Sequence, residues 1–369
     1  MRPRLSVLLA AAVFFISLFG AANAVELKEF MQTLYEKSLI YEEEYVDPEN
    51  VEITFPEEKQ NLIYIFLESM ETTFFDTENG GALEENVIPE LFQLAEDNIN
   101  FSHDDNVGGA LTVVDTTWTV AAMVAQTAGI PLSIHHYGTT SISLPGLTTL
   151  GDILEENGYY QVLMMGSDVT FADRDEYCLV HGTDVIYDYY TAMDDGIIDE
   201  DYYAWWGMED LYLFEYAKEK LTEIAQNEDP FAFTLLTADT HFPDGYVCDL
   251  CQDEYDSQYE NVCACSSRQV ADFISWIQEQ DFYENTTIVI VGDHKTMDNE
   301  YIEEAVTDPD YTRRIYNCVI NSRIESDCEK NRECTTLDMF PTTLAALGCT
   351  IEGDKLGFGV NLFPGKRRL

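Results

Sequence analysis

The stretch NLIYIFLESMETTFFD, residues 61–76, decides the fold. Its opening part, residues 61–67, is almost wholly apolar and rich in branched and aromatic side chains, which is typical of a strand buried on both faces of a mostly parallel sheet. The apolar run stops at Glu68. Because ligands of open α/β folds bind just beyond the carboxyl ends of the strands, we expect this carboxylate to point into a site.

Two later apolar segments, 231–237 and 287–291, also end in polar side chains, namely Asp239, Thr240, His241, Asp293 and His294. A single strand-end carboxylate usually turns to solvent, but three such ends meeting at one edge of a sheet form an N/O ligand set for a divalent cation. The set contains no thiolate. It therefore suits manganese, magnesium or zinc, and ligand type alone does not choose among them.

Helical and strand-like patterns alternate along the rest of the chain. We expect helices at 27–41, 86–99, 120–128, 148–157, 209–226, 268–278 and 337–347, and further strands at 160–165 and 316–320. Residues 166–177 are expected to form a loop. This alternation predicts a three-layer α/β/α fold with a mostly parallel central sheet.

The composition excludes some functions. Nineteen Lys and Arg residues against 69 Asp and Glu residues give a formal net charge of -50. Nucleic-acid binding requires clustered cations, and docking on an anionic bilayer is disfavoured for the same reason. The 46% hydrophobic content is enough for a large core, so the acidity does not indicate a disordered chain.

The N-terminus has the features of a targeting segment. Arg2 and Arg4 precede an apolar run at 5–19, and Ala22-Asn23-Ala24 has the form that a signal peptidase accepts. We therefore expect a signal peptide at 1–24 and a periplasmic or otherwise exported protein; an uncleaved anchor is the alternative. A helical lead-in at 25–58 and a main domain at 59–369 would follow.

Nine cysteines fit an oxidising compartment. Four of them lie in a polar insertion at 242–265, and two more lie nearer the C-terminus: they are Cys248, Cys251, Cys263, Cys265, Cys328 and Cys334. The pattern CxxC followed by CxC could bind zinc, but two local disulfides are the favoured interpretation. The sequence does not give their connectivity.

A nucleophile is expected beside the metal. Thr119 would open the helix at 120–128, whose free N–H groups and dipole favour a bound anion. A hydroxyl bound to the metal there would lose its proton easily and could attack phosphorus. A helix N-cap is the alternative role. Thr112, Thr116 and Thr117 are also nearby, so the residues alone do not single out Thr119.

These motifs resemble the alkaline-phosphatase/sulfatase superfamily: Glu-Ser after an apolar strand, a Thr-headed helix closing in Gly-Ile-Pro, and a late Gly-Asp-His. Sulfatases begin the helix motif with Cys or Ser, with Pro two residues later and Arg four residues later. Here those positions are Thr119, Ala121 and Met123, which argues against formylglycine chemistry. A threonine nucleophile resembles the lipoteichoic acid synthase and phosphoglycerol transferase branch instead.

Within that branch the chain resembles the phosphoglycerol transferase I family, which decorates osmoregulated periplasmic glucans. The resemblance runs from about residue 61 to 362 and rests on NLIYIFLES (61–69), TTWTVAAMVAQTAGIPL (116–132), ADTHFPDG (238–245), the cysteine-bearing insertion, GDHKTMDN (292–299) and LDMFPTTLAALG (337–348). It implies that residues 59–369 are a sulfatase-like catalytic domain.

The resemblance also implies a role for individual residues. Glu68, Asp293 and His294 would be metal ligands, and Thr119 would be the nucleophile and fourth ligand. The spacing of Thr119 from Gly129 matches the sulfatase motif and favours it over its neighbours. His241 would bind the substrate headgroup or protonate the leaving oxygen, and Arg174 would bind the phosphate. Mn²⁺ is the favoured metal, with Zn²⁺ and Mg²⁺ as alternatives.

The implied function is a metal-dependent transfer of phosphoglycerol from a lipid or glycan donor to a periplasmic glycan, through a phosphoglyceryl-threonine intermediate. Phosphatidylglycerol and a phosphoglycerol-substituted glycan are the two candidate donors. Family members carry several transmembrane helices, whereas this chain has at most an N-terminal segment for membrane contact and is strongly acidic. Both departures weigh against a membrane lipid donor. A phosphodiesterase or phosphatase, a phosphoethanolamine transferase and a secreted non-catalytic binding protein are the alternatives.

Overall fold

The computed structural model describes residues 14, 17, 39–133, 142–326 and 328–364. Nearly all of the predicted signal segment and of the predicted helix at 27–41 lies outside these described residues. Helix α3 (Ile40–Glu43) covers the end of the second range. Within the described part of the chain, no helix is long and apolar enough to cross a membrane. Residues 46–369 form one compact unit, and residues 1–45 form another.

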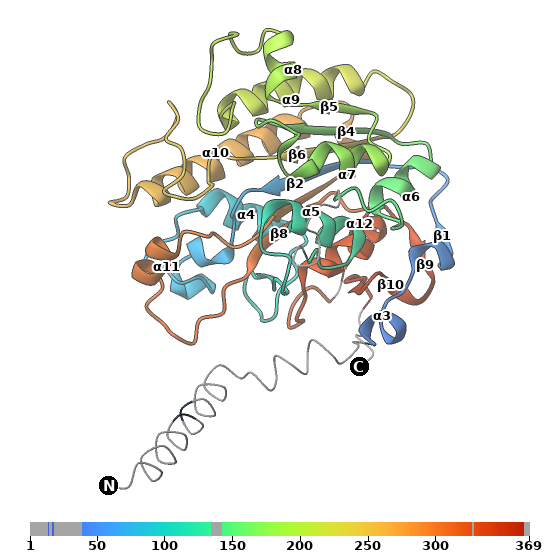
Figure 1. The fold of residues 1–369 in the computed structure, drawn as a ribbon, viewed down its shortest axis with the longest axis horizontal. Coiled ribbons are helices and arrows are strands. Elements are labelled where there is room, and N and C mark those ends of the chain that lie inside the picture. Colours follow the sequence, from blue (N-terminus) through green and yellow to red (C-terminus); the bar gives the residue numbers. More distant parts are fainter. Residues whose placement is uncertain (1–13, 15–16, 18–38, 134–141, 327, 365–369) are drawn as a thin grey trace, which may run out of the picture. The chain divides into compact units, whose positions relative to one another are not determined.

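The centre of the larger unit is a seven-stranded sheet in the order β3-β8-β7-β2-β6-β4-β5 (Figure 1). Its parallel strands are β2 (Asn61–Leu67), β4 (Tyr160–Met165), β5 (Val185–Tyr187), β6 (Phe231–Leu236) and β7 (Thr286–Gly292). β8 (Ile315–Ile320) and β3 (Gly109–Ala110) continue one edge in antiparallel pairing. The strand expected at residues 61–67 lies in the middle and is fully buried, as predicted.

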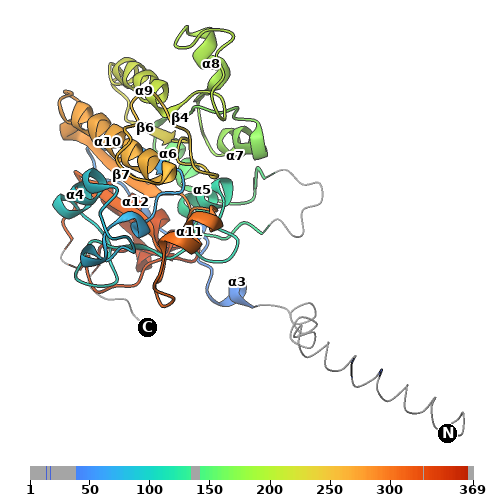
Figure 2. The same ribbon diagram turned by 90° about the vertical axis from the view of Figure 1, so that its left-hand side faces the viewer.

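Helices cover both faces of this sheet. Alternate side chains of β2, such as Ile63 and Ile65, join a core with helices α4 (Pro89–Asp97), α9 (Asp210–Ile224) and α10 (Gln258–Gln278). Residues of the opposite parity face α5 (Thr119–Ala128), where Tyr64 donates a hydrogen bond to Gln126 at 3.1 Å. Figure 2 shows α4, α9 and α10 on one side of the strands and α5 on the other.

Helix α6 (Leu150–Glu156) and helix α7 (Arg174–Val180) lie on the same side as α5, and α12 (Met339–Ala346) packs against α5. The three layers confirm the predicted α/β/α architecture with a mostly parallel sheet. They also place the carboxyl ends of β2, β6 and β7 at one edge, where the polar residues predicted to form a site are found.

Smaller elements lie in the rest of the described part of the chain. They are α8 (Tyr189–Asp194), α11 (Asn299–Ala305), β1 (Ile53–Thr54), β9 (Thr350–Ile351), β10 (Lys355–Leu356), β11 (Gly359–Val360), and the 3-10 helices η1 (Pro48–Asn50), η2 (Thr72–Phe74), η3 (Thr77–Asn79), η5 (Phe171–Asp173), η6 (Tyr283–Asn285), η7 (Thr336–Asp338) and η8 (Glu352–Asp354). β1 pairs with β9, so part of the predicted lead-in packs with the C-terminal segment.

Two predicted boundaries were wrong. The helix expected at 268–278 begins at Gln258, because Ser257 caps it by accepting a hydrogen bond from the Glu260 N–H. The last part of the predicted insertion is therefore helical. The loop expected at 166–177 contains the start of α7, which Arg174 opens.

The structure does not show the two predicted disulfides: all nine cysteines are free in it. Cys328 and Cys334 use separate partners: the first contacts the Phe363 carbonyl and the second the Gly109 carbonyl. Cys263 lies in the hydrophobic core between α10 and the sheet. Cys248, Cys251 and Cys265 stand close together without a covalent bond.

Candidate metal and phosphate site

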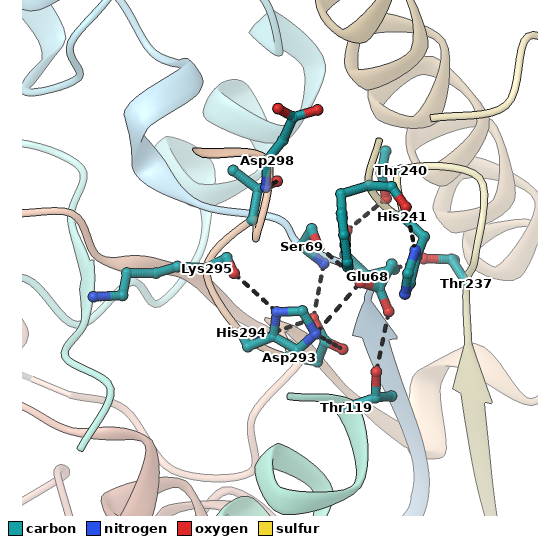
Figure 3. A network of polar contacts seen from close by, with 12 residues as sticks. Glu68, Ser69, Thr119, Thr237, Thr240, His241, Asp293, His294, Lys295 and Asp298 are labelled. Atoms are coloured by element: carbon teal, nitrogen blue, oxygen red, sulfur yellow. Dashed lines mark hydrogen bonds and ion pairs between the residues drawn. The ribbon is translucent and has the colours of Figure 1, made fainter. Parts of the chain in front are cut away.

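The side chains of Glu68, Asp293 and His294 meet at the carboxyl ends of β2 and β7, as Figure 3 shows. His294 Nε2 lies 3.4 Å from Glu68 Oε1 and 3.4 Å from Asp293 Oδ2. All three residues are buried. The strand ends that the sequence predicts to converge are therefore together.

Local backbone geometry holds the two carboxylates in place. Ser69 follows Glu68 in the left-handed region, with φ of 53°, and its N–H donates to Asp293 Oδ1 at 2.8 Å. Its hydroxyl donates to Glu68 Oε1 at 2.8 Å. Gly292 permits the close approach of β7, because a Cβ there would lie 1.9 Å from the Met70 carbonyl oxygen.

The ring orientation of His294 is also fixed. Nδ1 lies 2.9 Å from the Lys295 carbonyl oxygen, which can only accept, so Nδ1 carries the proton in the neutral ring. Nε2 then turns its lone pair towards the carboxylates, as a metal-ligating histidine requires. Burial alone would lower the pKa of His294, but the facing carboxylates of Asp293 and Glu68 raise it.

The site fits a divalent cation by its own chemistry. Asp293 Oδ2 and His294 Nε2 are buried without a hydrogen-bond partner. Burial and the neighbouring Glu68 raise the pKa of Asp293 to about 8, because two carboxylates share a small buried space. A cation bound between them would satisfy the unpartnered atoms and offset the repulsion.

Thr119 is the threonine that reaches this group. It is the first residue of α5, and its hydroxyl donates to Glu68 Oε2 at 3.3 Å. Thr116 is buried and bonded to the Val113 backbone instead, while Thr117 is exposed. The structure thus separates Thr119 from neighbours that the sequence left equivalent.

The N-terminus of α5 has no side-chain cap. Its N-cap position is Trp118, which cannot accept a hydrogen bond from the first turn. The alternative N-cap role does not apply to Thr119, which is the first residue inside the helix. The first N–H groups of α5 remain available for an anion bound near the Thr119 hydroxyl.

Arg174 is a buried residue of the site, with only 5% of its surface exposed. Its guanidinium donates to the Phe171 and Asp168 carbonyls at 3.0 and 2.6 Å and to the Ser167 hydroxyl at 3.0 Å. Burial lowers its pKa below the usual arginine value. These contacts fix the cation in the wall of a cavity that also includes Glu68 and Thr119.

The polar residues that follow β6 point to different parts of the structure. His241 lines the same cavity as Thr119, and its Nδ1 lies 2.7 Å from the Phe242 carbonyl oxygen. Thr240 donates to the Glu68 carbonyl at 2.5 Å and so joins β6 to β2. Asp239, expected to face the metal ligands, instead groups with Glu209 and Cys248.

The cavity has a volume of about 310 Å³. One wall is aromatic, from residues that the sequence analysis did not single out: Phe171, Tyr203 and Trp206. The Trp206 ring meets the His241 ring edge to face at a centroid distance of 4.8 Å. The exposed fractions of Phe171 and Tyr203 are 62% and 67%, so they form an open rim.

A second buried network supports the loop that carries His294. Glu71 is fully buried and accepts two hydrogen bonds from Arg313 and one from the Thr296 N–H at 3.0 Å. Sequence reasoning did not single out this pair. The only sequence signal for Glu71 was its position three residues after Glu68. Arg313 is distant in the sequence and belongs to no motif.

This fold and this arrangement of residues agree with a known class of proteins. A sequence model of the Sulfatase family matches residues 60–349, and the chain belongs to that family. It is also similar to phosphoglycerol transferase I from Escherichia coli O6:K15:H31, with 33% identity over 256 residues, which are 67% of this chain and 32% of the relative. The chain therefore spans about a third of the length of the curated relatives it matches.

Two solved structures show the same fold. An alkaline phosphatase superfamily protein from Vibrio parahaemolyticus has a TM-score of 0.65 at 20% identity, covering 85% of this chain and 72% of that one. The lipoteichoic acid synthase LtaP from Listeria monocytogenes has a TM-score of 0.63 at 21% identity, covering 85% and 79%. The resemblance to the alkaline-phosphatase/sulfatase superfamily is confirmed.

Proposed function

We propose that this chain is a metal-dependent phosphoglycerol transferase that works through a phosphoglyceryl-threonine intermediate. The observation that carries the proposal is the hydrogen bond from the Thr119 hydroxyl to Glu68 Oε2 at 3.3 Å, inside a cavity shared with Arg174 and His241. Nucleophile, anion-binding groups and a general acid candidate thus surround one space. The similarity to phosphoglycerol transferase I supports the choice of transferred group.

Glu68, Thr119, Asp293 and His294 would hold the cation, for which Mn²⁺ is favoured and Zn²⁺ or Mg²⁺ are alternatives. A bound divalent cation eases loss of the hydroxyl proton and neutralises charge on phosphate oxygens. The pairing of two carboxylates with a correctly oriented imidazole supports this assignment.

In the first half-reaction Thr119 Oγ attacks the phosphorus of the donor phosphodiester. The Oγ proton passes towards Glu68 Oε2, which already accepts its hydrogen bond. The bond from phosphorus to the donor alcohol breaks, and that alcohol takes a proton from His241 or from water. Arg174 and the uncapped N-terminus of α5 stabilise negative charge on the phosphoryl oxygens.

In the second half-reaction a glycan hydroxyl attacks the same phosphorus. The glycan hydroxyl gives its proton to His241 or to water, the bond from phosphorus to Thr119 Oγ breaks, and Oγ takes back the proton passed to Glu68 Oε2. The glycan then carries the phosphoglycerol group. A water molecule in place of the glycan would make the site a phosphodiesterase. The donor is a phosphoglycerol-bearing lipid or glycan.

The aromatic rim supports a glycan acceptor. Phe171 and Trp206 both line the cavity, with ring centroids 5.9 Å apart, and the Arg174 guanidinium lies over the Phe171 ring at 5.7 Å from its centroid. Sugar rings expose C–H faces that pack on aromatic rings, while their hydroxyls reach polar groups. The rim is therefore suited to hold an acceptor sugar close to the phosphoryl group.

The test is mass spectrometry of the protein after incubation with Mn²⁺ and a phosphoglycerol donor, followed by acid quenching. The proposal predicts a phosphoglycerol adduct on the tryptic or chymotryptic peptide that contains Thr119, and its loss when a glycan acceptor is added. Thr119→Ala should form no adduct. Thr117→Ala is the matched control, because that residue is exposed two positions away. Released glycerol phosphate without transfer to glycan would favour the hydrolase.

A further inference from the structure

A second cluster of ligand-type side chains lies outside the catalytic cavity. Cys248 and Cys251 belong to the segment before α10, and Cys265 lies in its second turn. The Cys248 sulfur is 3.8 Å from that of Cys251 and 3.7 Å from that of Cys265. The three sulfurs all lie within 4.8 Å of one another.

We propose that Cys248, Cys251 and Cys265 form a structural zinc site, with a carboxylate of the neighbouring Glu209 or Asp239 as the fourth ligand. A disulfide would require sulfurs about 2.0 Å apart. Four ligands placed tetrahedrally at the Zn–S distance of about 2.3 Å have sulfurs separated by about 3.8 Å. The two distances to Cys248 match the zinc arrangement.

The backbone between Cys248 and Cys251 forms a turn that allows both cysteines to bind one metal ion. The Cys251 N–H donates to the Cys248 carbonyl at 3.1 Å, which closes a turn and brings both sulfurs to one side. One turn after Cys265 on α10, Gln269 directs Nε2 to the Cys265 sulfur at 3.4 Å. An amide donor of this kind stabilises a thiolate from outside the ligand shell.

The carboxylates supply a second, independent observation. One oxygen each of Glu209, Asp239 and the sulfur of Cys248 lie within 4.8 Å of one another. Glu209 Oε1 accepts from the Tyr202 hydroxyl and Asp239 Oδ1 from the Asp210 N–H, while Glu209 Oε2 and Asp239 Oδ2 are buried without a partner. Unpartnered buried carboxylate oxygens beside thiols are costly unless a cation joins them.

Such a site would have a structural purpose. Residues 242–257 contain no helix or strand, so they add few backbone hydrogen bonds of their own. A metal joined to Cys248 and Cys251 would attach this segment to α10 through Cys265. Asp239 lies two residues before His241, so the same site would also brace the turn that carries the catalytic-cavity histidine.

The experiment measures metal content and a cobalt spectrum on the whole protein, purified without chelator. The proposal predicts about one zinc equivalent that is lost in Cys265→Ser and in Cys251→Ser but kept in Cys349→Ser, a buried cysteine outside the cluster. Cobalt exchanged into the wild type should give a near-ultraviolet thiolate-to-cobalt band, which the N/O site at Glu68 cannot produce.

Alkylation under non-reducing conditions completes the test. Bound zinc should protect the three cysteines until chelator is added. Chelation should lower the unfolding temperature of the wild type by more than that of Cys251→Ser, which keeps only the separate site at Glu68, Asp293 and His294. A disulfide between any two of the three cysteines, or free thiols with no zinc and no cobalt band, would overturn the proposal. Neither readout depends on transferase activity.

Discussion

His294 turns Nε2 to within 3.4 Å of Glu68 Oε1, while its Nδ1 is held by the Lys295 carbonyl at 2.9 Å. The ring is therefore oriented before any ligand binds. Sites arranged in this way need little reorganisation to hold a metal, and the backbone carbonyl that orients the ring sets which nitrogen is available.

Metal removal should destabilise the protein. Without a cation, the carboxylates of Glu68 and Asp293 repel each other in a buried space, as the raised pKa of Asp293 indicates. A metal present at a hundred times its dissociation constant should add about 2.7 kcal/mol of stability. Thermal unfolding with and without Mn²⁺ measures this, and Asp293→Asn should show almost no response. An equal response in that variant would contradict the assignment.

The variants Thr119→Ser and Thr119→Ala should differ clearly in turnover. The serine variant keeps a hydroxyl near Glu68 Oε2 and should retain measurable turnover. The alanine variant has no nucleophile, so turnover should fall by roughly a thousandfold or more while metal binding is largely kept. Steady-state rates on an aryl phosphodiester and metal titrations provide the two readouts. Full activity in Thr119→Ala would eliminate the mechanism.

Arg174→Lys should reduce kcat/KM by roughly 10- to 100-fold, because charge-assisted hydrogen bonds of this kind contribute about 1.5–3 kcal/mol. A lysine cannot bond at once to the Phe171 and Asp168 carbonyls and the Ser167 hydroxyl and still present a cation to phosphate. Kinetics on a donor analogue test this. Unchanged kcat/KM would show that the guanidinium only braces its loop.

Trp206→Ala should raise the KM for a glycan acceptor several-fold and leave adduct formation from the donor unchanged. The reason is that Trp206 lies on the cavity rim rather than at the metal ligands. Trp206→Tyr keeps an aromatic face and should restore most of the acceptor affinity. Equal KM values for the acceptor in the wild type, Trp206→Ala and Trp206→Tyr would show that the aromatic rim does not bind the acceptor.

Glu71→Gln should cost about 3–5 kcal/mol, the usual result of breaking a buried ion pair by removing one partner. Glu71 is fully buried against Arg313, whereas Glu333, which pairs with Arg314 at 2.9 Å, has 53% of its side chain exposed. Glu333→Gln is therefore the matched control and should cost under about 1 kcal/mol. Denaturant unfolding gives both values, and similar costs would show that burial is not the cause.

The architecture could be predicted from the sequence because continuous hydrophobic runs indicate buried strands directly. Residues 61–67 read as a strand buried on both faces and form the middle strand of the sheet. Glu68, Asp293 and His294 could be placed together because parallel strands end at the same edge. Short elements such as β5 and α8 gave too few residues for a periodic pattern.

Other features depend on turns that no local pattern specifies. Asp239 and His241 follow the same strand, yet one faces Cys248 and the other the cavity. The burial of Arg174 depends on carbonyls of its own loop, which composition alone presents as a polar surface segment. The cysteine spacing favoured two local disulfides, with zinc binding as the alternative, and did not separate Cys263 from Cys265. Helical geometry turns Cys263 into the core and Cys265 towards Cys248.

The most direct measurement is peptide mass spectrometry of the protein quenched during turnover with Mn²⁺ and a phosphoglycerol donor. The account predicts one phosphoglycerol adduct, located on Thr119, that disappears when glycan acceptor is added. Turnover without any adduct, or an adduct on Thr116 or Thr117 that persists in Thr119→Ala, would contradict the assignment of Thr119 as the nucleophile.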